Sequence, residues 1–553
     1  MTPPAWSLRF QLFHAGKIKK KDVIFLKSNM IHRFSNVPEA NIQRSRINRS
    51  FTYKTTCSEG YLIPFYNDIM YPGDTFIGRA TIFGRMATPV FPIMDNLFVD
   101  TFYFGVPWRL VWDKFQEFMG EVNRSGEITT YEIPHRTVVT AYEANSLEDY
   151  FGLPTKVAGY SHSILPLRAY ALIYNDWFRS DYLQDPIGIE FGDYNEDSTN
   201  NYDDKYVLMR RGKRFDYYTS CLPFPQAGPG VEISLGGNAP VYANDGRNVS
   251  GIPANSISDV ATAGRLLYRE TDGNWPHEIY TTNGTNASVY AGNTFVYADL
   301  KNIYGVTINT LREAFAMQQF LERLAIGGNR YTEIIYSMFG VKSPDARLQR
   351  PEFLGHGQAR ININPVEQTA QSSETSPQGN LAAYAVFRNE HHAFSYSATE
   401  HMIILGLLSI RADLTYQQPL WKQWSYKTRE ELYWPQFSHL GEQAVYTREI
   451  DCRGAATDSV VFGYQERYGE CRYYPSLITG LFKSNTDSGL DRWHLSQDFE
   501  VAPVLNSDFI VDNPPVSRVV AVPSEPHFYI DIYMDLQCIR PMPIYSTPGL
   551  TRM

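Results

Sequence analysis

The chain has 553 residues and a formal net charge of −9; 43% of its residues are hydrophobic and 20% are charged. This balance excludes a disordered chain, because it supplies enough apolar side chains for a large core. The longest apolar run, Met402 to Ile410, is far too short to span a bilayer. Five scattered cysteines without a CxxC pair argue against a disulfide framework and against a zinc site.

The first fifty residues are basic, unlike the rest of the chain. Residues 1–50 hold ten Lys or Arg against Asp22 and Glu39, a net charge of +8, which leaves −17 for the remainder. A basic arm on an acidic body is typical of a tail that meets nucleic acid, and the alternative is a solvated tail. The arginines of this arm that we expect to contact nucleic acid are Arg33, Arg44, Arg46 and Arg49.

Side chains from Leu97 to Val106 alternate, with aromatic residues on both sides of the alternation. The period of two predicts a strand, and its aromatic faces predict that protein covers both of them. The alternation ends at Pro107. Large apolar residues at helical spacing from Trp108 predict a helix that Gly120 ends.

A second helix is predicted from Leu167 to Phe178, because apolar residues recur at helical spacing behind Pro166, which suits a first turn. We assign 106–183 to a helical insertion. The acidic segment that follows, Asp176 to Asp204, echoes the spacing of a calcium loop. Ser198 stands where the sharp turn of such a loop needs Gly, so we interpret it as a solvated acidic loop.

The composition changes from Gly228 to Leu300. This segment holds ten Gly and eight Asn and no Lys, which predicts a long, loop-rich surface insertion over 228–300. Loops of this length are usually functional or disordered. The alternative is a tolerated insertion without a special role.

Two further helices are predicted in the middle of the chain. One covers Leu311 to Leu324 and is closed by Gly327 and Gly328; the other covers Tyr331 to Phe339 and is closed by Gly340. We interpret their apolar stripes as core rather than as cofactor sites.

A histidine-rich group and a basic-aromatic group are the remaining candidate sites. The spacing of His391, His392, Glu400 and His401 matches no metal-binding helix, and adjacent histidines on a strand point to opposite faces, so we assign no metal. In the second group, arginine could contact phosphate while tyrosine stacks on unpaired bases. We favour structural packing for it, but keep its arginines as candidate nucleic-acid contacts: Arg467 and Arg472.

The C-terminus contains the clearest alternation of the chain, from Phe528 to Cys538, which predicts a long half-buried strand. Pro541 and Pro543 stop it, and 541–553 is expected to be a Pro-rich arm. Strand-like ends around a helical middle suggest one barrel completed by both ends of the chain, within a single domain over 51–540.

Several long blocks of the sequence closely resemble the major capsid protein of the gokushovirus branch of the Microviridae, small icosahedral phages with single-stranded DNA. They follow one order from about Met30 to the C-terminus, which leaves residues 1–29 open as a misassigned start. The blocks include MATPVFPIMDNLFVDTFYFGVPWRLVWDKFQEFMG, LPLRAYALIYNDWFR, RRGKRFDYYTSCLPFPQ, GGNRYTEIIYSMFGVKSPDARLQRPEFLG, VFGYQERYGECRYYPSLITGLF and RPMPIYSTPGL.

The resemblance implies a mainly β fold, a single eight-stranded jelly-roll barrel with large helix- and loop-containing insertions. It implies a structural protein rather than an enzyme, without catalytic residues or cofactors, which self-assembles through homopentamers into a T=1 icosahedral shell around circular single-stranded DNA. The implied location is the virion, assembled in the host cytoplasm without membrane insertion. The implied partners are a small basic DNA-binding protein, a pilot protein, an internal scaffolding protein and a host surface receptor, met by the projecting 228–300 insertion.

Two other classes of protein remain as alternatives. A glycan-active or glycan-binding β-sandwich protein would use the abundant Tyr and Trp to line sugar subsites, and as an enzyme it would need two close carboxylates in a cleft. A phage attachment or tail protein would more often show fibrous or trimeric repeats, and the sequence has no internal repeat of useful length.

Overall fold

The computed structural model describes side chains in residues 42–121, 131–193, 205–232, 307–372 and 377–545. Arg33, most of the 228–300 insertion, the calcium-like spacing beyond Asp193 and residues 546–553 lie outside the described residues. Within the insertion the structure gives the backbone of five short strands: β8 (Val241–Ala243), β9 (Leu266–Arg269), β10 (Glu278–Asn283), β11 (Asn286–Val289) and β12 (Val296–Ala298).

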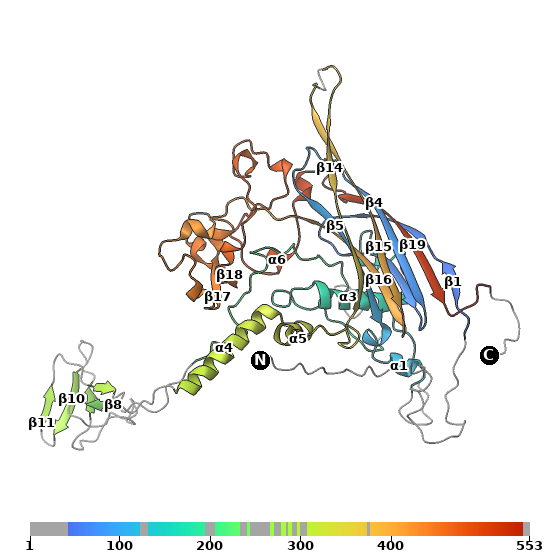
Figure 1. Ribbon diagram of the computed structural model, residues 1–553. Coiled ribbons are helices and arrows are strands. Elements are labelled where there is room, and N and C mark those ends of the chain that lie inside the picture. Colours follow the sequence, from blue (N-terminus) through green and yellow to red (C-terminus); the bar gives the residue numbers. More distant parts are fainter. Residues whose placement is uncertain are drawn as a thin grey trace, which may run out of the picture.

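Two antiparallel sheets form the body of the molecule, so the fold is mainly β, as predicted (Figure 1). The first sheet has the order β1-β19-β4-β15-β14, with β2 also paired to β19, and the second has the order β13-β5-β16-β3. The strands of the first sheet are β1 (Ser45–Asn48), β2 (Phe51–Cys57), β4 (Thr75–Met86), β14 (Asn362–Glu367), β15 (Leu381–Ser397) and β19 (Phe528–Arg540). Those of the second are β3 (Ile63–Met70), β5 (Leu97–Pro107), β13 (Glu352–Arg360) and β16 (Met402–Ala412).

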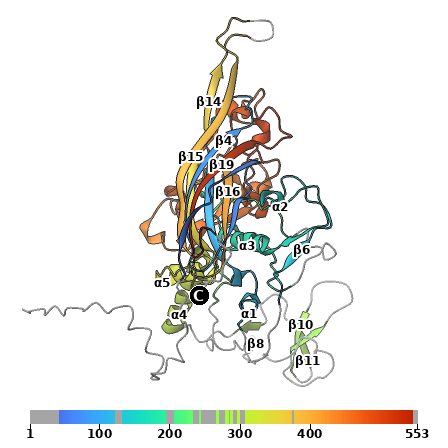
Figure 2. The ribbon, with the colours of Figure 1, turned by 90° about the vertical axis from the view of Figure 1, so that its right-hand side faces the viewer.

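Strand β19 lies beside β4 in the first sheet (Figure 2), and its other edge pairs with β1 and β2. Ile530 of β19 is opposite Thr55 of β2, and Ile532 is opposite Ile82 of β4. Alternate residues of β19 are buried, which confirms the half-buried strand predicted there. Ile532 shares one core cluster with Val99 of β5, so both ends of the chain complete one sandwich.

Protein covers both faces of β5, as its alternation predicts. Val99 to Pro107 are all buried. Tyr103 belongs to the core between the sheets, whereas Phe104 packs against Trp177 and Phe178 from outside the sandwich. A strand that faces protein on both sides needs apolar residues at most of its positions, which explains the composition of β5.

The continuous helix predicted from Trp108 to Gly120 is wrong. The structure has a 3-10 turn, η3 (Trp108–Leu110), and one α-helical turn, α1 (Phe115–Phe118). Between them Trp112 is fully buried, and its indole N–H donates to Asp193. Just after Trp112 the N–H of Asp113 donates to the carbonyl of Phe191 at 2.9 Å rather than to a carbonyl of the preceding turn, which interrupts the helix.

Two long excursions leave the sandwich: residues 108–351 connect β5 to β13, and residues 413–527 connect β16 to β19. The helix behind Pro166 is confirmed as α3, followed by a π-helical turn. The first excursion also contains short elements: β6 (His135–Thr137), α2 (Leu147–Tyr150), β7 (Ser161–Ser163), α3 (Leu165–Ile173) and the π turn (Tyr174–Phe178). The second contains β17 (Glu442–Tyr446), β18 (Val461–Glu466), α6 (Ser507–Ile510) and several 3-10 turns.

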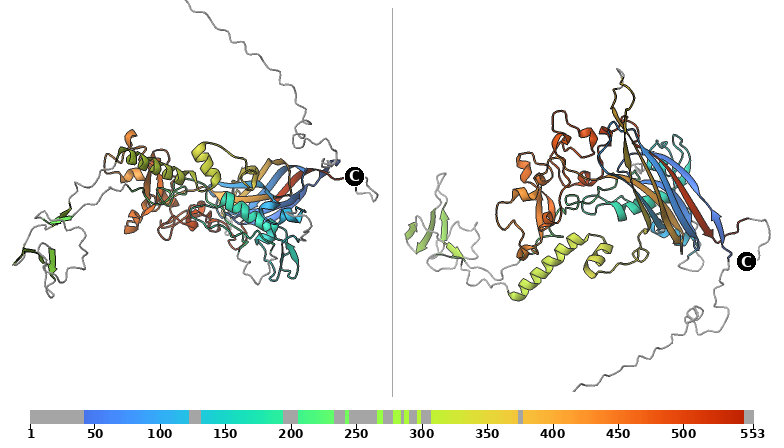
Figure 3. Two further views of the ribbon diagram at one scale, coloured as in Figure 1. Left: turned by 90° about the horizontal axis from the view of Figure 1, so that it is seen from below. Right: turned by 45° about the horizontal axis from the view of Figure 1, so that its top comes forward.

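The two middle helices form where they are predicted, as α4 (Ile308–Gly327) and α5 (Tyr331–Phe339), and both end at the predicted glycines. The prediction that their apolar stripes are core is wrong. Ala325 is the one buried residue of α4, and α5 has none. In Figure 3 α4 stands apart from the strands of the sandwich, and the contacts among the described residues involve mainly its second half, through residues such as Gln226 and Tyr182. None of the helices in the described ranges is long and apolar enough to cross a bilayer.

A buried carboxylate holds the first excursion to β5. The Asp100 side chain is 1% exposed, and its Oδ2 accepts hydrogen bonds from Arg211 at 2.6 Å and from Arg411 of β16 at 2.9 Å. Its Oδ1 accepts a hydrogen bond from Gln358 of β13 at 2.8 Å. Burial alone would raise the pKa of Asp100, but the two guanidinium groups outweigh it and lower that pKa.

The second excursion packs against the first beside Asp100. The N–H of Asp512 donates to the carbonyl of Arg211 at 2.9 Å, and the N–H of Lys213 donates to the carbonyl of Ile510 at 2.7 Å. Burial raises the pKa of the Asp512 carboxyl to about 7, although Arg411 and Lys213 act to lower it. The two excursions therefore meet each other and the sandwich at one cluster of buried charges.

Replacing the central carboxylate tests this cluster. We expect Asp100→Asn to lower the free energy of unfolding by about 3–5 kcal/mol, because it leaves two largely buried arginines without their counter-charge. Asp531→Asn is the matched control: it removes an exposed ion pair with Lys54 and should cost at most about 1 kcal/mol. Urea unfolding of both variants measures the difference, and equal losses would contradict this role of Asp100.

The raised pKa of Asp512 makes stability depend on pH. Its folded-state pKa of about 7 lies above the ordinary value of 3.8, so the folded state holds the proton between these pH values. The contribution of this group to the free energy of unfolding therefore falls as pH rises from 4 to 7. We expect Asp512→Asn to gain stability relative to wild type between pH 5 and pH 8, measured by urea unfolding. A stability difference that is independent of pH would be inconsistent with the assignment.

Candidate functional site

The face of the first sheet that points away from the second sheet is open to solvent, and we call it the outer face. It carries aromatic and cationic side chains that are exposed: Lys54, Arg79, Phe83, Arg85, Tyr384, Arg388, Tyr529 and Tyr533. They come from β2, β4, β15 and β19, where every second residue points outward. The inward residues of the same strands fill the core, so the scaffold beneath the outer face is rigid.

Aromatic rings and guanidinium groups are neighbours across the strands of the outer face. Tyr529 is opposite Arg85, and Phe83 is opposite Arg388. The Phe83 ring is 51% exposed and the Tyr533 ring 48%. Half-exposed rings beside cations form a surface on which unpaired bases can stack while the cations contact phosphate.

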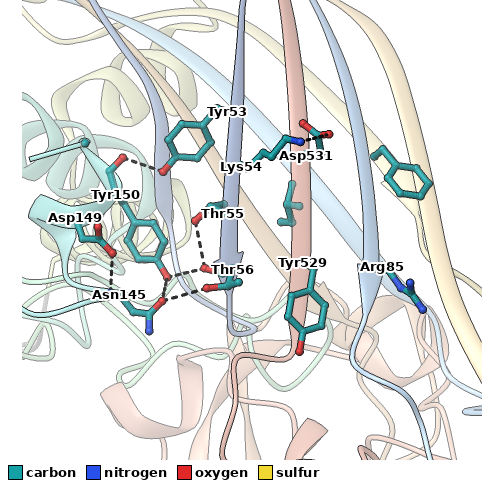
Figure 4. Close-up of a pocket in the computed structure, with 13 residues that line it drawn as sticks. Tyr53, Lys54, Thr55, Thr56, Arg85, Asn145, Asp149, Tyr150, Tyr529 and Asp531 are labelled. Atoms are coloured by element: carbon teal, nitrogen blue, oxygen red, sulfur yellow. Dashed lines mark hydrogen bonds and ion pairs between the residues drawn. The ribbon is translucent and has the colours of Figure 1, made fainter. Parts of the chain in front are cut away.

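A hollow of about 730 Å³ borders the outer face where β2 meets the loop around α2 (Figure 4). The hydroxyl of Tyr53 donates to the carbonyl of Tyr150 at 3.0 Å, and the hydroxyl of Tyr150 donates to the carbonyl of Thr56 at 3.0 Å. Burial raises the pKa of Tyr53 to about 12, so its hydroxyl stays protonated at neutral pH. Lys54 and Asp531 lie at the rim as an exposed pair 3.6 Å apart.

This arrangement suits binding rather than catalysis. The phenols of Tyr53 and Tyr150 already donate to backbone carbonyls, so neither is poised to transfer a proton. In the stretches with described side chains, no three His, Cys, Asp or Glu residues group closely enough to hold a metal ion. His391 and His392 point to opposite faces of β15: His391 Nε2 lies 3.1 Å from Thr101 Oγ1, whereas His392 is exposed.

Three of the predicted arginines lie at the edge of the first sheet. Arg44 is exposed, and the Nε of Arg46 donates to Gln537 of β19 at 3.1 Å. Arg49 forms an ion pair with Asp68, so part of its charge is already compensated. Arg44 and Arg46 therefore extend the cationic character of the outer face toward the N-terminus.

The other two predicted arginines lie elsewhere. Arg467 and Arg472 follow β18, at the end of the molecule opposite to β1 in Figure 1, so the structure does not bring the two arginine groups together. Arg472 pairs with Glu466 at 2.5 Å, and Arg467 lies over the ring of Tyr468. Tyr473 stacks on Tyr217 in a third core cluster, in line with the packing role that we favoured for this group.

Sequence reasoning missed the residues of the outer face. The signal was present in TFIGRATIFGRM, the sequence of β4, where arginine and phenylalanine occupy alternate positions. Their neighbours across the sheet come from β15 and β19, hundreds of residues later, and only the pairing of the strands brings them together.

Comparisons with known proteins agree with one another. Residues 35–550 match the family described as capsid protein (F protein). The chain is 42% identical to capsid protein VP1 of Chlamydia phage 1, over 96% of this chain and 99% of that protein. It is also 42% identical to capsid protein VP1 of Bdellovibrio phage phiMH2K, over 94% and 97%, and 33% identical to that of Spiroplasma virus 4, over 95% and 98%.

These similarities span almost the whole chain, including both sheets and both excursions. They confirm the resemblance to phage capsid proteins that the sequence blocks indicated, and they support a structural rather than an enzymatic role. The chain therefore belongs to the phage capsid protein (F protein) family and is a structural component of the virion.

Proposed function

We propose that this capsid protein builds a closed T=1 icosahedral shell, through homopentamers, around a circular single-stranded DNA genome. The observation that carries the proposal is the near-complete match to capsid proteins VP1, together with a mainly β sandwich. Closed symmetry allows one subunit to use the same contacts many times, which suits a shell made of one chain.

We further propose that the sandwich is an eight-stranded jelly roll within a single domain over 51–540. Support comes from the strand order, in which β2-β19-β4-β15 faces β3-β16-β5-β13. Along the chain these strands pass repeatedly from one sheet to the other, as jelly-roll strands do. β1 and β14 extend the first sheet at its edges, and the two excursions grow from the connections between strands.

The outer face is the surface that we propose for the genome. Its rings and cations suit contact with DNA backbone and unpaired bases without sequence-specific reading. Arg44 and Arg46 would continue this surface, Arg33 and Arg49 would add to it, and Arg467 and Arg472 form a second candidate contact. Because the whole chain carries −9, it does not neutralise a genome alone.

Other partners rest on the resemblance to gokushovirus capsids. They are a small basic DNA-binding protein, a pilot protein, an internal scaffolding protein and a host receptor, with the 228–300 insertion projecting to meet the receptor. The glycan-active alternative loses its support, since the comparisons point to structural capsid proteins over both sheets of the sandwich.

The oligomeric state of the expressed chain tests the shell. We expect closed particles or pentamers by size-exclusion chromatography and negative-stain imaging, because capsid subunits bury large areas against their copies. A chain that stays monomeric under all assembly conditions, or that cleaves oligosaccharides, would overturn the proposal.

Binding of labelled oligothymidine tests the outer face. We expect Tyr529→Ala to weaken binding by about 1–3 kcal/mol through lost stacking, and Tyr529→Phe to retain it. Arg85→Ala should lower the slope of log affinity against log salt by about 0.7, the value for one phosphate contact on a single strand. Val139→Ala, at an exposed site that follows β6 and is not on a strand of the first sheet, is the control. If Tyr529→Ala and Arg85→Ala both bind like this control, the outer face is not the DNA surface.

A further inference from the structure

The helices α4 and α5 leave an extended apolar surface without a partner among the described residues. Ten large apolar side chains, nine on these helices and one two residues beyond α5, are more than a third exposed. These are Ile308, Leu311, Phe315, Met317, Phe320, Ile326, Tyr331, Tyr336, Phe339 and Val341. Phe315 is 61% exposed and Phe339 78%, so the surface is not a rim of half-covered side chains.

Apolar residues occur on more than one side of α4. Met317 and Phe320 lie on a different side of the helix from Ile308 and Phe315, and all four are exposed. Polar residues such as Arg312 and Gln319 lie between these apolar side chains, so α4 is not apolar all round, but it exposes large apolar groups on two sides. Most of the stability of a helix also comes from tertiary packing, and the described residues leave the first half of α4 largely uncovered.

We propose that the surface of α4 and α5 is a contact between copies of this chain, buried when a neighbouring subunit packs onto it. This inference rests on the proposed assembly into a shell and assigns one of its interfaces. Helix α4 has 20 residues and is therefore about 30 Å long. It projects from the sandwich and can reach a neighbour (Figure 1).

The size of the surface fits an interface between subunits. Ten large side chains, each about half exposed, present on the order of 800 Å² of apolar area. That is about the area each partner buries in a standard protein–protein interface.

The charge of the surface favours a second copy over other occupants. Between 307 and 341 three arginines balance three glutamates, whereas the whole chain carries −9. Two acidic copies repel each other over most of their surfaces, so they meet at lowest cost where the surface is neutral and apolar. A neutral apolar surface offers little to DNA, and little to the basic residues 1–41, whose net charge is +5.

Site-specific photocross-linking in the full chain tests the identity of the occupant. A benzophenone amino acid replaces Phe315 in one variant and Val139, which is 58% exposed, in the control. In closed particles we expect the Phe315 variant to yield chain-to-chain dimers that the Val139 variant does not. Cross-links only within one chain, only to nucleic acid, or none at all would overturn the inference.

A charge substitution supplies an independent readout. We expect Phe315→Glu to keep the circular dichroism spectrum of wild type but to lower the yield of closed particles at least about ten-fold, since it buries a charge at the contact. Val139→Glu should assemble as wild type does. Assembly of Phe315→Glu at the wild-type yield would overturn the interface proposed for α4 and α5 but not the proposed shell. A wild-type chain that forms no oligomer would overturn the proposed shell, and this interface with it.

Discussion

The buried negative charge of Asp100 is the constraint on which the arrangement of the molecule depends. A carboxylate on the covered face of β5 is tolerable only with hydrogen-bonding partners, and Arg211 and Arg411 supply them. Arg211 belongs to the first excursion, and its backbone also pairs with Asp512 of the second. One charge thus fixes two segments, together longer than the sandwich itself, against the same strand, while the outer face on the other sheet stays open.

How far the sequence predicts the fold depends on whether a pattern is local. The strands at Leu97 and Phe528 were predicted correctly because the period of two belongs to the strand itself. The helix after Pro107 was not, because burial of Trp112 is decided by a core assembled from distant segments. The positions of α4 and α5 were correct, since their glycine ends are local signals. Their burial was not, because burial depends on a partner.

The candidate site was less predictable than the fold. Searching for clusters along the chain found Arg467 and Arg472, which pair with or lie over their own neighbours. The outer face depends instead on Arg85 lying opposite Tyr529, which only the register of β4 and β19 reveals. A sheet distributes a binding surface over several strands, so each strand contributes too few residues to form a motif.

The place of β19 has a consequence for biosynthesis. This strand lies between β4 and the pair β1 and β2, yet the ribosome makes it last. Until β19 has been translated, no strand joins β1 and β2 to β4. The backbone hydrogen-bonding groups at that edge of β4 are then unpaired and prone to aggregate. A prematurely terminated chain would lack the strand that unites the sheet.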